Sequence, residues 1–106
     1  MLEIANDPFK VILRAVQELW SGLKTDIQWN HTLDMDKKEY GCTTFPDDGS
    51  TPLIDLNPEL TVLVAVEILA HELAHVATPG DEHGVDWEEA FSAIHEKFND
   101  LIGGGA

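Results

Sequence analysis

Residues 62–82 read VLVAVEILAHELAHVATPGDE and contain the motif H-E-x-x-H between His71 and His75. Two histidines four residues apart on an α-helix differ by about 40° around its axis, so both imidazoles leave the same face. Two neutral imidazoles supply half of a tetrahedral zinc site. Glu72 lies about 100° from His71, where it can reach a water on the metal without binding the metal. Because zinc brings the pKa of such a water toward about 7, the motif predicts that Glu72 takes its proton as the water attacks a carbonyl.

The same motif also occurs by chance on surface helices, where the histidines bind nothing. Here residues 62–70 are apolar on almost every side, which predicts a buried helix. Histidines at the end of a buried helix need partners, because a buried polar group without one is unfavourable. A further imidazole, that of His83, follows closely. The sequence therefore favours a metal site over surface histidines.

The third protein ligand is open between one histidine and two glutamates. A catalytic zinc usually has three protein ligands and one open position. His83 lies eight residues after the motif, and Pro79-Gly80 provide a bend that can return the loop to the site. On the last predicted helix, Glu88 lies on the flank of the apolar face and Glu89 points to solvent. We expect His83 to be the ligand, with Glu88 and Glu89 as alternatives.

Three helices are predicted from apolar side chains that recur every three or four positions. Asn6-Asp7-Pro8 and Asn57-Pro58-Glu59 each combine a capping side chain with a proline of the first turn, so each predicts a helix start. The predicted helices end near Gly22, near Ala77 and near Ile102, and the last begins at residue 85 or 86.

Three short strands are predicted between the first two helices, because β-favouring residues there are separated by polar turns. They cover residues 25–33, 40–45 and 51–56. We expect the first two to form a hairpin. With the helices, these strands predict one α+β domain over residues 1–106, with a small, mostly antiparallel sheet.

Composition restricts the partners of the chain. It has 106 residues, which suit one domain, and a net charge of −14 from 20 acidic and 6 basic residues. Nucleic-acid binding by this chain alone is not expected, because phosphate contacts need clustered Lys and Arg. No apolar run reaches about 18 residues, so no membrane span is expected. Residues 1–7 lack the pattern of a secretory signal, and Cys42 is the single cysteine, so we expect a cytoplasmic protein.

The residues above resemble the zincin metallopeptidases, and most of all the SprT-like and WLM group. The pattern of that group is H-E-x-x-H, a short loop, and then a histidine and an aromatic residue a few positions later. Here the aromatic residue is Trp87, and the resemblance covers about residues 51–95. It implies a zincin-like fold and hydrolysis of peptide bonds, with Glu72 as general base. The zinc ligands that it implies are His71, His75 and His83.

The resemblance also implies a role for the strand before the metal helix, and the sequence departs from related groups in some features. In zincins the strand before the metal helix often lies along the cleft and pairs with extended substrate, and residues 51–56 occupy that position. The metzincin spacing is absent, since Thr78 stands where that group has glycine and no methionine follows the motif. SprT-like proteins usually add a cysteine-rich zinc module or basic DNA-binding segments, which the composition here does not match.

Three functions follow from these patterns. We expect a zinc-dependent metallopeptidase with Zn²⁺ as cofactor and a peptide or protein as substrate. The alternative is a non-catalytic zinc-binding domain for interaction or regulation, which predicts a fourth protein ligand such as Glu88. A weaker alternative is a metal-free helical partner protein.

Overall fold

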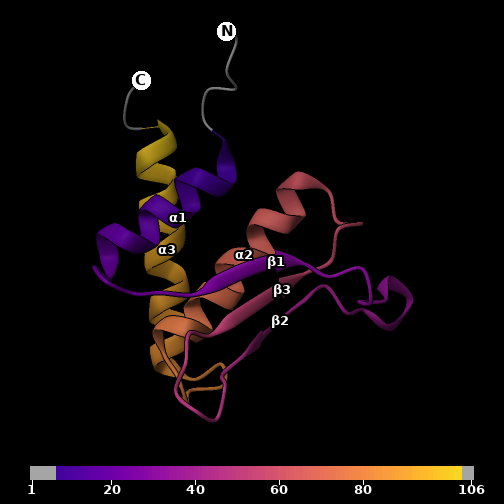
Figure 1. Cartoon of the computed structure of the whole chain (residues 1–106). Coiled ribbons are helices and arrows are strands. Elements are labelled where there is room, and N and C mark those ends of the chain that lie inside the picture. The colour runs from indigo at the N-terminus through magenta and orange to yellow at the C-terminus, as the bar shows by residue number, and fades with distance from the viewer. Residues whose placement is uncertain (1–6, 104–106) are drawn as a thin grey trace, which may run out of the picture.

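A computed structural model of the chain describes residues 7–103 and places three helices and three strands in an α+β arrangement (Figure 1). The elements are α1 (Pro8–Leu19), β1 (Asp26–Trp29), the 3₁₀ turn η1 (Met35–Lys37), β2 (Gly41–Thr44), β3 (Leu53–Leu56), α2 (Val62–Ala77) and α3 (Val85–Gly103). The α+β class and the order of the elements are therefore as predicted. Among these residues, no helix has the length and apolar character that crossing a membrane requires.

The sheet is mixed, with the order β1-β3-β2. β1 runs parallel to β3, whereas β2 runs antiparallel to it. The predicted hairpin of the first two strands and the mostly antiparallel sheet are therefore wrong. β3 takes the centre because it is the strand whose side chains are most buried, including Ile54 and Leu56. The connection from β1 to β2 is also much longer than the two to five residues of a tight hairpin loop.

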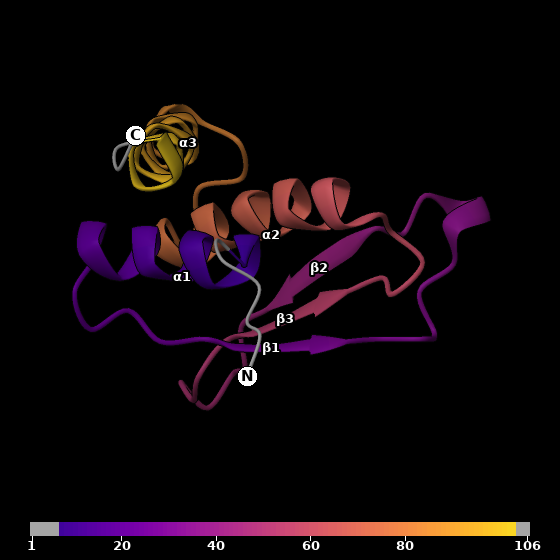
Figure 2. The ribbon, with the colours of Figure 1, turned by 90° about the horizontal axis from the view of Figure 1, so that it is seen from above.

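All three helices lie on one side of the sheet (Figure 2). α2 contacts β2, β3 and α1, and α3 packs across both α1 and α2. The core lies between these layers and is formed by buried aliphatic side chains with one tryptophan. Its largest members include Ile12, Ile54, Leu56, Leu69, Leu73, Trp87 and Ile94.

The ends of the helices are fixed by capping side chains. Asp7 caps α1 by accepting a hydrogen bond from the Phe9 amide at 3.0 Å, and the predicted cap Asn6 lies outside the described residues. α2 begins later than predicted, with Thr61 as its cap. The reason is that Asn57 is fully buried and its amide donates to the carbonyls of Leu33 and Glu39, so it anchors a turn instead of starting the helix.

The first turn of α2 is exposed, contrary to the burial predicted for residues 62–70. Val62, Leu63 and Val64 are exposed, Leu63 by 82%. Burial begins at Ala65 and continues through the part of the helix that holds the motif. The apolar composition of this segment therefore predicted the helix but not the point at which the core covers it.

Candidate metal centre

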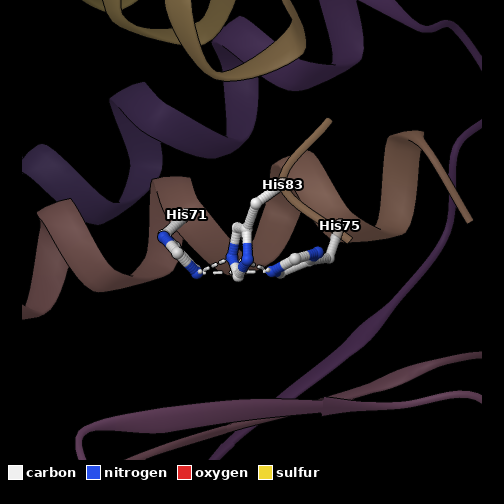
Figure 3. A group of neighbouring side chains, drawn as sticks. All are labelled: His71, His75 and His83. Atoms are coloured by element: carbon white, nitrogen blue, oxygen red, sulfur yellow. Dashed lines mark hydrogen bonds between the residues drawn. The ribbon is translucent and has the colours of Figure 1, made fainter. Parts of the chain in front are cut away.

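Three imidazoles converge on one point beside α2 (Figure 3). His71 and His75 lie one turn apart on the helix, and His83 returns from the loop that follows it. The Nε2 atoms are 3.3 Å apart between His71 and His75, 3.1 Å between His75 and His83, and 3.1 Å between His83 and His71. The three histidines predicted as zinc ligands are thus brought together, and within residues 7–103 they form the one group of three potential ligands that meets at a point.

This arrangement fits a tetrahedral metal ion. With Zn–N distances of about 2.0–2.1 Å, two nitrogens of a regular tetrahedron lie about 3.3–3.4 Å apart. The observed separations, 3.1 and 3.3 Å, are close to that value. Three mutually close Nε2 atoms do not satisfy one another by hydrogen bonds, because each ring nitrogen of a neutral imidazole carries either one hydrogen or one lone pair. A cation that accepts all three lone pairs resolves the conflict.

The neutral form of His71 and His75 is favoured by their surroundings. Burial lowers the pKa of His71, although the neighbouring carboxylate of Glu72 acts in the opposite direction. Burial likewise lowers the pKa of His75 against the same carboxylate, and the nearby imidazoles lower it further. At neutral pH both rings therefore keep a lone pair free for a metal ion.

The loop that carries His83 is held by Asp81. The carboxylate of Asp81 accepts hydrogen bonds from the amides of Gly84 and Trp87, both at 2.9 Å. It thereby satisfies amides at the start of α3, where negative charge is favourable. His83 itself has a φ of +66°, in the left-handed region that most residues avoid. The role of Asp81 was not predicted from the sequence, although Asp is a frequent capping residue at helix starts.

Trp87 forms one wall of the site. Its ring centroid lies 4.8 Å from that of His71, 5.6 Å from that of His75 and 4.7 Å from that of His83. Its indole Nε1 donates to the backbone carbonyl of His71 at 3.3 Å. The aromatic residue expected beside the third histidine thus contacts all three rings and restricts how they can turn.

Glu72 lies next to the histidines and is only 7% exposed. Its Oε1 accepts a hydrogen bond from the hydroxyl of Thr43 at 2.7 Å. Its Oε2 lies 3.8 Å from Nε2 of His71. One carboxylate oxygen is therefore anchored to β2, and the other faces the point at which the imidazoles meet.

The two glutamates considered as alternative ligands do not take part. Glu88 and Glu89 are both exposed on the first turns of α3, and neither belongs to the cluster that the three histidines form. Of the three candidates, His83 is therefore the one that the fold brings to His71 and His75.

A cleft of about 430 Å³ opens beside the histidines. It is lined by Glu72, His75 and His83 and by Gly41 to Thr43 of β2. The expectation that residues 51–56 border the cleft is wrong, because β3 is the central strand and both of its edges are paired. Within the described part of the chain β2 pairs with β3 alone, so its outer edge is open.

No protein-family model, curated protein or solved structure matches the chain. The chemistry of the site is therefore inferred from its own atoms. A cluster of three imidazoles that meet at their Nε2 atoms, a buried carboxylate beside them and an adjoining cleft are the parts that a hydrolytic zinc site requires.

Proposed function

We propose that the chain is a small zinc-dependent metallopeptidase with a zincin-like arrangement of its site. The observation that carries this proposal is the meeting of three Nε2 atoms at 3.1–3.3 Å beside the buried carboxylate of Glu72. In this proposal His71, His75 and His83 hold Zn²⁺, and Glu72 is the general base. Zinc bound there would act as a Lewis acid that polarises a carbonyl and lowers the pKa of water.

The residues of the chain then have separate tasks. Glu72 Oε2 accepts a proton from the attacking water and passes it to the amine nitrogen as the C–N bond breaks. Asp81 and Trp87 keep the histidines in place through the contacts described above. The open edge of β2 offers backbone groups to an extended peptide lying in the cleft, which supports a peptide or unfolded protein as substrate.

The alternative of a non-catalytic zinc domain predicts a fourth protein ligand that closes the site. Structural zinc sites have four protein ligands, whereas catalytic sites keep one position open. Among residues 7–103 the cluster consists of three histidines, and Glu88, the suggested fourth ligand, is exposed outside it. The adjoining cleft and the position of Glu72 therefore favour catalysis over a purely structural role.

The test is hydrolysis of an unfolded, fluorescently labelled protein by the purified chain loaded with one equivalent of zinc. We expect turnover that is lost on chelation and restored by added zinc. Glu72→Gln should bind zinc as the wild type does and lose most of the activity, because general-base catalysis typically contributes about 10²- to 10⁴-fold. Equal activity of Glu72→Gln and wild type would remove the proposed base. Zinc binding without turnover in the wild type would favour the non-catalytic alternative.

A further inference from the structure

The hydrogen bond between β2 and Glu72 identifies a residue that the motif does not contain. Thr43 has one hydroxyl hydrogen and two oxygens of Glu72 within reach, the carboxylate Oε1 at 2.7 Å and the backbone carbonyl at 3.4 Å. The shorter contact to the charged oxygen is the stronger one. The hydroxyl therefore donates to Oε1 and leaves Oε2 toward the histidines.

The contact between Thr43 and Glu72 follows from the way β2 packs against α2. Gly41 lies so close to α2 that a Cβ atom there would be 2.7 Å from Cγ2 of Ile68. Two strand residues span about 6.6 Å, and four helical residues rise about 6 Å, so two steps along the strand match one helical turn. Thr43 is two residues after Gly41, and Glu72 is four after Ile68. The close approach at Gly41 thus places the hydroxyl of Thr43 at the height of the carboxylate.

The two neighbouring positions on β2 show that the strand presents Thr43 to the helix. Burial alternates along β2, with Thr43 partly buried and both Cys42 and Thr44 exposed. Thr43 also lines the cleft beside Glu72. Because the outer torsion of a glutamate side chain is broad and roughly two-fold, a carboxylate without such a donor would not be fixed in one orientation.

We propose that Thr43 is a positioning residue that holds Glu72 Oε1 so that Oε2 is directed at the attacking water. This inference rests on the proposed function, in which Glu72 is the general base. Thr43 touches neither the reacting atoms nor the metal ligands in this proposal. Its effect is on the orientation of the base, and therefore on the chemical step more than on binding of substrate or zinc.

The experiment compares Thr43→Val, Thr43→Ser and Thr44→Val in the full chain loaded with zinc. Valine keeps the shape of threonine and removes the hydroxyl, serine keeps the hydroxyl, and Thr44 is the exposed neighbour that serves as the matched control. Thr43→Val should lower kcat about 10- to 100-fold while KM and zinc affinity stay within about threefold, because loss of an orienting partner typically has that effect. Thr43→Ser and Thr44→Val should behave as the wild type.

A second readout does not depend on turnover. In zinc-free and zinc-loaded protein, the ¹³C chemical shift of the Glu72 carboxyl carbon should change in Thr43→Val and remain near the wild-type value in Thr43→Ser and Thr44→Val. An unchanged shift in Thr43→Val, or an unchanged kcat in that variant while Glu72→Gln is inactive, would overturn the role of Thr43 and leave the proposed function standing. If the wild type has no activity, the proposed function fails, and with it the positioning role, whereas the carboxyl shift still decides whether the contact exists.

Discussion

Asp81 connects the folding of the His83 loop to the metal centre, so its replacement tests how the site is held together. In Asp81→Ala the amides of Gly84 and Trp87 lose a charged acceptor that lies 2.9 Å from each. Loss of a helix cap typically costs about 0.5–2 kcal/mol, and a hydrogen bond to a charged group contributes about 1.5–3 kcal/mol. Because water can reach part of this loop, we expect the free energy of unfolding to fall by about 2 kcal/mol.

The same substitution should weaken zinc binding. Without the two hydrogen bonds, the loop has to be ordered when the metal binds, and His83 must adopt its positive φ without support. We therefore expect zinc affinity to fall about tenfold or more, in the range seen when partners of metal ligands are removed. Urea unfolding of the zinc-free protein measures the first effect, and competition with a chromophoric chelator measures the second.

Two further variants make this result specific. Asp81→Asn keeps one carbonyl oxygen for one of the amides, so its effect should be intermediate. Asp86→Ala removes an exposed acidic residue from the first turn of α3, close to Asp81 in the sequence, and should lower the free energy of unfolding by less than about 1 kcal/mol. The role of Asp81 would be excluded by an Asp81→Ala variant that changes the free energy of unfolding by no more than Asp86→Ala does and that binds zinc as tightly as the wild type.

Three other predictions follow from the structure. Gly41→Ala should destabilise the protein by about 1–3 kcal/mol and lower kcat, because its Cβ would meet Ile68 at 2.7 Å and push β2 from α2; urea unfolding that matches the wild type would contradict this. Zinc at 100 times its Kd should stabilise the fold by about 2.7 kcal/mol, which calorimetry would record as a higher Tm, and an unchanged Tm would exclude specific binding to the folded state. The folded pKa of His71 and of His75 lies below the usual value of 6.5, so the unfolded chain takes up protons first, and the zinc-free protein should lose stability as the pH falls below about 6.5. The double variant His71→Gln, His75→Gln should lack that part of the pH dependence, and an identical profile would refute its assignment to these two groups.

The parts of the site that follow from local geometry were predictable from the sequence. The spacing of His71 and His75 on one helix fixes their common face, and the short loop with Pro79-Gly80 brings His83 within reach. Helix spacing also placed Glu88 off the core face, in agreement with its exposure. These inferences need only the periodicity of a helix and the length of a loop.

The features that depend on contacts between distant segments were not predictable in the same way. The strand preferences of residues do not specify which strands pair. They therefore predicted three strands but not that β3 lies at the centre of the sheet. Asn57 is a residue type that often caps helices, but its side-chain amide donates hydrogen bonds to the carbonyls of residues 33 and 39. For this reason α2 starts later, at Val62. Thr43 is one threonine of an ordinary strand, and only the register of β2 against α2 gives it a role.

In the proposed function His71, His75 and His83 bind one metal ion and leave one coordination position open. Zinc K-edge X-ray absorption on the protein with one equivalent of bound zinc measures this coordination. We predict three imidazole nitrogens at about 2.0–2.1 Å with one further light-atom ligand, and loss of one imidazole in His83→Ala. Failure to bind one equivalent of zinc, a sulfur ligand at about 2.3 Å, or an unchanged imidazole count in His83→Ala would contradict it.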